Sequence, residues 1–269
     1  MPDIIVPDWP APAAVHAAFT LRAGGVSAPP FDSLNPAAHV GDEPDAVAEN
    51  RARLRRRLQL PSEPAWLEQV HGCRVAALDG GWAAGAAADA AVTHAADRVC
   101  VVQVADCLPV LLCAAGGSAV GAAHCGWRGL AAGVLEATVH ALRTPPAQLL
   151  AWLGPAIGQG HFEVGEDVHA AFCAGDPAAA AAFVKNARGR WQCDLYALAR
   201  RRLAALGVSR VYGGGWCTYA DPVRFFSYRR DGRCGRMAAL IWMSRAAPSP
   251  AAAARAVIPL TSGSARSRR

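Results

Sequence analysis

Residues 99–130 constrain the fold most strongly, because three short apolar runs follow one another there with a thiol and an imidazole at their ends. The first run, Val99–Val104, is rich in β-branched residues and predicts a buried strand. Pro109 cannot donate to a β-ladder, so a break is expected there before a second strand over residues 110–113. A turn with two glycines then leads to a third strand over residues 119–123, which predicts a hairpin.

Chemically useful side chains lie at the ends of these strands. Cys107 leaves the first strand, His124 is expected to end the third, and a glycine-flanked sequence at residues 126–129 leads into an apolar helical pattern over residues 130–142. A second imidazole, His71, lies upstream and is expected on a strand. Loops at strand ends are where a rigid scaffold usually presents functional groups. The helix should also direct its unpaired N–H groups towards His124 and favour an anion there.

His71, Cys107 and His124 supply two nitrogens and one sulfur, a donor set that suits zinc with a fourth position open for water or substrate. Their long and irregular spacing excludes a finger-type motif. Each residue also has an ordinary structural interpretation, because buried cysteine is common and a single histidine is more often structural than a ligand. The pattern by itself leaves both interpretations open.

Longer strings extend the comparison to nearly the whole chain, from about Ile4 to Met243. They occur in the order WLEQVHG, ADCLPVLL, AHCGWRG, LGPAIG, FEVGEDV, CTYADPVRFFSYRRDG and GRMAALIW. Together they resemble the family variously called multicopper polyphenol oxidase (laccase-like), purine nucleoside phosphorylase and peptidoglycan editing factor. The resemblance implies that His71, Cys107 and His124 are the zinc ligands and the catalytic residues. Cys125 departs from the motif, where a small residue is usual, and could compete for the metal or oxidise.

Four arginines are candidates for binding substrate or phosphate, because each offers charge-assisted contacts to an anion. The resemblance implies that Arg22 lies near the substrate pocket, because the matching family residue does so. The ordinary alternative for each one is a surface ion pair. The candidates are Arg22, Arg51, Arg128 and Arg229. Asp89 is expected either to cap a helix or to act as a site carboxylate, and we favour a structural role for it.

The chain has 269 residues, of which 53% are hydrophobic, so it is long enough for one large core. Its strands do not alternate cleanly with helices, which weakens a doubly wound arrangement. The resemblance implies an α+β fold, a single domain of mixed β-sheets flanked by helices with a cytotoxic-necrotizing-factor-like architecture. We expect a single catalytic domain over residues 1–245. Residues 246–269 are Ala, Pro, Ser and Arg without periodicity, which predicts a disordered basic tail.

Composition narrows the class of partner. A net charge of +6 is compatible with acidic or phosphorylated substrates and does not demand nucleic acid. Nine scattered cysteines indicate reduced thiols and a cytoplasmic protein. No apolar run reaches membrane-spanning length, and the first residues lack the pattern of a signal peptide. We therefore expect a nucleoside and phosphate as partners, with no nucleic acid and no membrane, while the oligomeric state stays open.

Three functions remain at this point. The resemblance implies a zinc-dependent purine nucleoside phosphorylase for adenosine, inosine and methylthioadenosine, with adenosine deaminase activity; an open zinc fits deamination because it makes water nucleophilic at neutral pH. The alternative implied by the editing-factor name is an amidase that removes L-Ser from UDP-muramoyl precursors, with Cys107 as nucleophile and His124 as base, or with attack by zinc-bound water. Copper-dependent polyphenol oxidation is less well supported, because the chain has three Met and no His-x-His pair, although copper could bind the same residues.

Overall fold

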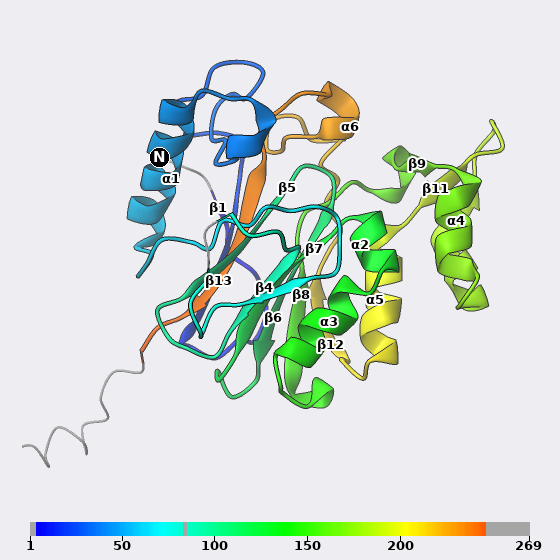
Figure 1. The fold of residues 1–269 in the computed structure, drawn as a ribbon. Helices are drawn as coiled ribbons and strands as arrows, with labels where there is room; N and C mark the ends of the chain where they lie inside the picture. The colour runs from blue at the N-terminus through cyan, green and yellow to red at the C-terminus, as the bar shows by residue number, and fades with distance from the viewer. Residues whose placement is uncertain (1–3, 83–84, 246–269) are drawn as a thin grey trace, which may run out of the picture.

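The computed structural model describes residues 4–82 and 85–245, and two β-sheets packed on each other form its centre (Figure 1). The larger sheet has six strands in the order β12-β8-β6-β7-β4-β3. Its two outer pairs, β12–β8 and β3–β4, are parallel, and the other neighbours are antiparallel. The strands are β3 (Val75–Ala77), β4 (Ala90–Thr93), β6 (Leu108–Ala114), β7 (Val120–Cys125), β8 (Leu149–Leu153) and β12 (Arg210–Gly213).

The smaller central sheet is antiparallel throughout and has the order β1-β2-β13-β5. It pairs the beginning of the chain with its end, so β13 lies between β2 and β5. Its strands are β1 (Ile4–Ile5), β2 (Val15–Thr20), β5 (Val99–Val104) and β13 (Met237–Met243). The layer between the two sheets is filled by buried apolar side chains, among them Phe19, Leu111, Trp152 and Ile241.

Helices cover the outer faces of this two-sheet core, and a short three-stranded sheet joins them at one end (Figure 1). The α3 and α5 helices pack on the larger sheet through residues such as Leu135 and Leu198, while residues such as Leu60 cover the smaller sheet. The helices are α1 (Pro44–Leu58), α2 (Trp127–Ala131), α3 (Val134–Ala141), α4 (Glu166–Cys173), α5 (Leu195–Ala205) and α6 (Tyr228–Asp231). The short sheet consists of β9 (Glu163–Val164), β10 (Phe183–Lys185) and β11 (Trp191–Cys193).

The predicted α+β class, a single domain with mixed sheets and flanking helices, is confirmed, as are the strand Val99–Val104 and the β6–β7 hairpin. The expected break at Pro109 is wrong. Pro109 lies inside β6, opposite His124, and its carbonyl accepts a hydrogen bond from Gly154 N at 2.9 Å, so the ring is tolerated at the second residue of the strand. The third strand also continues past His124 through Cys125.

The single helix expected over residues 130–142 is wrong as well. The helical backbone begins at Trp127 and is interrupted at Gly133, whose φ of 95° is left-handed, so two helices form. Because α2 has only five residues, it does not provide the long helix that was expected to favour an anion beside His124. The predicted tail at residues 246–269 lies outside the described residues, and the domain extent of 1–245 stays a prediction. Within the described ranges, no helix is both long and apolar enough to cross a bilayer.

Candidate metal centre

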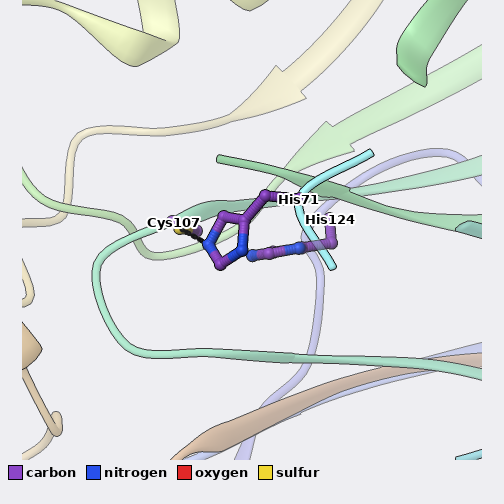
Figure 2. A group of neighbouring side chains, drawn as sticks. All are labelled: His71, Cys107 and His124. Carbon is purple, nitrogen blue, oxygen red and sulfur yellow. Dashed lines mark hydrogen bonds between the residues drawn. The ribbon is translucent and has the colours of Figure 1, made fainter. Parts of the chain in front are cut away.

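Three side chains from separate segments converge at one end of the larger sheet. His71 comes from the loop before β3, Cys107 from the turn between β5 and β6, and His124 from β7. Their ligand atoms all lie within 4.8 Å of one another, and Figure 2 shows the three side chains gathered at one point. Cys107 Sγ is 3.8 Å from His71 Nε2, and the two imidazole rings meet edge to face with centroids 4.8 Å apart. These donors can hold one metal ion.

His71 was expected on a strand, and that prediction is wrong. The residue lies in a tight loop and has a left-handed φ of 61°. The buried Asp89 carboxylate holds this loop by accepting three successive backbone N–H groups, from Val70 at 3.2 Å, His71 at 2.9 Å and Gly72 at 2.7 Å. Charge-assisted hydrogen bonds of this kind offset the unfavourable backbone conformation. The position of the exposed His71 imidazole therefore depends on Asp89.

Asp89 also orients His124. Its Oδ1 atom lies 2.8 Å from His124 Nδ1, and its carbonyl accepts from His124 N at 2.7 Å. When Nδ1–H donates to a carboxylate, the lone pair of Nε2 stays free to bind a metal. Many metal-bound histidines have such a carboxylate contact on their other ring nitrogen. The residue lies directly before the strand β4, so the favoured structural role as a helix cap is wrong, and Asp89 is a carboxylate of the site that contacts both histidine segments. One carboxylate thus fixes both imidazoles.

Two glycines of the sequence Gly126–Trp127–Arg128–Gly129 let the chain pass close to this centre. A Cβ on Gly126 would lie 2.9 Å from Cys107 Sγ and 3.0 Å from a carbon of the His71 ring. A Cβ on Gly129 would lie 2.8 Å from the Gly72 carbonyl. Both positions exclude a side chain, because these distances are shorter than van der Waals contact. The glycine-flanked motif is therefore a packing requirement of the site.

Charges at the centre favour a thiolate. Burial by itself would raise the pKa of Cys107, but the charge and hydrogen bond of His124, with a smaller contribution from His71, lower it to about 6. Burial would likewise lower the pKa of His124, but the Cys107 thiolate and the Asp89 carboxylate raise it to about 9. Metal ligation requires a deprotonated cysteine and a neutral imidazole, so a bound cation would displace the His124 proton. The thiolate is already favoured.

Cys125 does not join the site, contrary to the expectation that it could compete for metal. Successive side chains of a strand point to opposite faces, so Cys125 faces away from His124. It is fully buried among the apolar residues under α2 and α3, and burial raises the pKa of its thiol well above the usual value. A thiol in this environment is inert.

The three donors open into a cavity of about 500 Å³ that is also lined by Arg128, Arg229 and Arg236. Among the described residues, the guanidinium group of none of these arginines forms an ion pair with a carboxylate, although each side chain is held in place by other contacts. Arg128 stacks on Trp127, and Arg229 donates to the Glu163 carbonyl at 2.7 Å. The cavity therefore contains guanidinium groups whose charge is not neutralised by the chain, which suits an anionic ligand.

The other two candidate arginines lie elsewhere. Arg22 pairs with Asp32 at 3.1 Å and packs over the Phe226 ring. Arg51 donates to the Pro36 carbonyl and stacks on Trp66, and it lines neighbouring cavities. Neither lines the cavity at the metal donors. The structure therefore brings Arg128 and Arg229 to the site and leaves Arg22 and Arg51 outside it.

Sequence reasoning missed two contributors. Arg236 enters from the start of β13, and the only signal was its place in the long string GRMAALIW. Asp106 has a left-handed φ of 88°, and its carboxylate accepts from Thr218 Oγ1 and Arg229 N, both at 2.6 Å. It thereby ties α6, which carries Arg229, to the turn that carries Cys107. Its signal was the adjacency of Asp106 to Cys107.

Comparison with known proteins adds a family to this geometry. Residues 16–244 match the family model described as multi-copper polyphenol oxidoreductase laccase. The chain belongs to this family. A relative from Pseudomonas aeruginosa, named purine nucleoside phosphorylase PA4543, is 54% identical to this chain over 89% of this chain and 98% of its own length. An Escherichia coli relative, named purine nucleoside phosphorylase YfiH, is 53% identical over 90% of this chain and 100% of its own.

Solved structures are similar over the same length. The Neisseria meningitidis protein NMB0706 has a TM-score of 0.87 and 48% identity, covering 90% of this chain and 99% of its own. YlmD from Geobacillus stearothermophilus has a TM-score of 0.81 and 32% identity, covering 87% and 93%. The description of the family names a metal, and the three clustered side chains are donors that could bind a metal ion. The family description thus agrees with a metal, and His71, Cys107 and His124 are the cluster that could hold it.

Proposed function

We propose that this chain is a zinc-dependent purine nucleoside phosphorylase acting on adenosine, inosine and methylthioadenosine, with adenosine deamination as a second activity of the same site. The observation that carries the proposal is one cavity holding both a metal donor set and three arginines without carboxylate partners. Phosphorolysis needs a phosphate site beside the sugar, which the arginines can supply, and the names of the curated relatives agree with that reaction. Deamination needs an activated water, which a metal held by the three donors can supply. All nine cysteines are unpaired, which agrees with a cytoplasmic enzyme.

Zinc is the metal we propose, on the chemistry of the donors. Two imidazoles and one thiolate are ligands zinc accepts, and the Asp89–His124 hydrogen bond is the outer contact such ligands usually have. Blue copper adds a weak axial methionine, but Met237 is buried between the sheets, where its sulfur lies 3.1 Å from Phe226 N. When bound, zinc supplies Lewis-acid chemistry without a redox change.

The chain's own residues would bind and orient the reactants. Arg128, Arg229 and Arg236 would hold phosphate beside the sugar, and Asp106 would fix the backbone of Arg229 while they do so. In phosphorolysis a phosphate oxygen forms a bond to C1′ as the C1′–N9 bond breaks, and the departing base takes up one proton. The products are ribose 1-phosphate and the free purine. In deamination water replaces the 6-amino group of adenosine, giving inosine and ammonia.

The proposal is tested by anaerobic turnover. Zinc-loaded protein should convert adenosine to adenine and ribose 1-phosphate when phosphate is present, and to inosine when it is absent, because neither reaction needs oxygen. His124→Ala should abolish both activities together, since both use one site. Products are separated by liquid chromatography. If the zinc form is inactive while copper-loaded protein oxidises phenols with oxygen, the chain is an oxidase; if UDP-muramoyl-Ser alone is cleaved, it is the editing amidase.

Alanine at Arg128, Arg229 or Arg236 should raise the KM for phosphate about 10- to 100-fold and change the KM for inosine much less. Each variant removes one charge-assisted contact to phosphate, worth roughly 1.5–3 kcal/mol. Steady-state kinetics with each substrate varied in turn measures both constants. Arg22→Ala is the control, because Arg22 pairs with Asp32 outside the cavity. An unchanged phosphate KM in all three cavity variants would place the anion elsewhere.

A further inference from the structure

A second cavity of about 740 Å³ adjoins the one that holds the metal donors. The two cavities share three lining residues, His39, Gln69 and Gln103. The second cavity is walled by the half-buried Trp66 and by apolar residues that include Leu78. A cavity of this size, lined by both apolar and polar side chains, can hold a small molecule. A ligand bound at the metal donors can therefore extend past the shared residues into it.

Gln103 is the unusual member of the shared wall. It is the one polar residue of β5, whose sequence is VCVVQV, and it is 4% exposed. Its backbone is satisfied on the open edge of that strand by the Gln69 side chain, which accepts from Gln103 N at 2.7 Å and donates to its carbonyl at 2.8 Å. Its own Oε1 is buried without a hydrogen-bond partner in the part of the chain that the structure describes.

A buried amide oxygen without a partner costs free energy, so a rotation of the amide that brings it to a polar group of a ligand in the cavity is favoured. An amide offers one acceptor and one donor side by side. That pair matches the edge of adenine, where a 6-amino group donates and a ring nitrogen accepts. After a half-turn of the amide it matches hypoxanthine, where the 6-oxo group accepts and N1–H donates. Because β5 is held by β13 and by Gln69, the amide is presented from a rigid strand.

We propose that Gln103 reads the 6-substituted edge of the purine, with the base lying against the wall shared by the two cavities; this rests on the proposed nucleoside function. The sugar then lies on the side of the metal donors and the arginines. The same amide serves 6-amino and 6-oxo purines by rotating. Gln103 therefore favours purines that carry a hydrogen-bonding group at position 6, without discriminating between an amino and an oxo group.

The test compares substrates that differ only at position 6. Gln103→Leu should lower kcat/KM for adenosine and inosine about 10- to 100-fold, because each loses its hydrogen bonds to the amide. Purine riboside has hydrogen at position 6 and keeps only the ring nitrogen that accepts from the amide, so it should lose clearly less than adenosine does. The KM for phosphate should not change. Calorimetric titration with inosine in the absence of phosphate should show a dissociation constant weakened about tenfold, which is independent of turnover.

A matched control variant separates a loss of purine recognition from a loss of protein stability. Gln192→Leu removes another amide whose Oε1 is buried without a partner, but Gln192 lies in β11 and lines neither cavity. It should leave all three substrates unchanged. Gln103→Leu should melt no earlier than the wild type, because it removes an unpartnered polar atom. If Gln103→Leu does not fold, Gln103→Met is used in its place. Methionine is similar in length to glutamine and lacks the amide that forms the hydrogen bonds.

The possible outcomes distinguish the proposed role of Gln103 from the proposed nucleoside function on which it rests. Equal losses for adenosine, inosine and purine riboside, or no loss for any, would overturn the role of Gln103 while phosphorolysis by the wild type still stood. If the wild-type protein neither binds nor cleaves any of the three nucleosides, the nucleoside function fails and this role fails with it. Loss of the 6-substituted substrates alone supports both.

Discussion

Cys107→Ala should remove nearly all of the bound zinc and lower phosphorolysis more than about 100-fold, beyond the 10- to 100-fold typical of a residue that only orients a ligand. Cys107 supplies the only sulfur in the cluster, and two imidazoles alone make a weaker and less complete zinc site. Elemental analysis measures the metal, which should fall from about one equivalent per chain to near zero. Zinc should also raise the melting temperature of the apo wild type and not of the variant.

The control is Cys125→Ala, the same substitution on a cysteine next to His124 that faces the apolar core. It should keep its zinc and its activity. The comparison also separates the two roles open to Cys107. If Cys107→Ala kept full zinc while losing activity, the thiol would act as a nucleophile with His124 as its base, and the amidase alternative would replace phosphorolysis.

Asp89→Asn should weaken zinc binding about 10- to 100-fold and destabilise the fold by about 3 kcal/mol. The carboxylate accepts from three backbone N–H groups and from His124 Nδ1, whereas an amide presents an N–H₂ group to some of these donors. The His71 loop and the His124 ring should lose their positions together. Competition with a chromophoric chelator measures the affinity, and urea unfolding of the metal-free protein measures the stability.

A second aspartate provides a matched control. Asp79 accepts from His94 N at 2.9 Å and lies 2.8 Å from His94 Nδ1, so it repeats the Asp89–His124 pairing away from the metal donors. Asp79→Asn should reduce stability and leave zinc affinity unchanged. Equal zinc affinities in wild type and Asp89→Asn would show that Asp89 serves the fold alone and that the imidazoles are held by other contacts.

Much of the fold could be predicted because its signals are local. The short apolar run Val99–Val104 is rich in β-branched residues, which favours a buried strand, and the two glycines between β6 and β7 favour a hairpin. The errors came from local rules that tertiary contacts overrode. Pro109 is tolerated in β6 because the hydrogen bond to Gly154 uses the proline carbonyl as acceptor and does not require an N–H group from the proline.

The candidate site could be predicted only in part. The strings that contain His71, Cys107 and His124 carry the donor types, and glycines at 126 and 129 mark where the backbone must pass close to them. Arg128 and Arg229 lie at the cavity, but Arg22 and Arg51 lie outside it. Nothing in the local pattern of an arginine says whether a carboxylate such as Asp32 will lie beside it, because that depends on how distant segments pack.

The sequence by itself determined the strands, the hairpin, the donor types and the family resemblance, because these depend on neighbouring residues and on the size of the apolar core. The tertiary structure alone decided which groups meet. Antiparallel pairing of Ala90 with Ala123 sets the register that places Asp89 beside His124, and a shift of one residue would turn Cys125 towards the site instead. The unpartnered amide of Gln103 likewise follows from the packing of β5 between two cavities. Register and packing are long-range properties, so no local pattern encodes them.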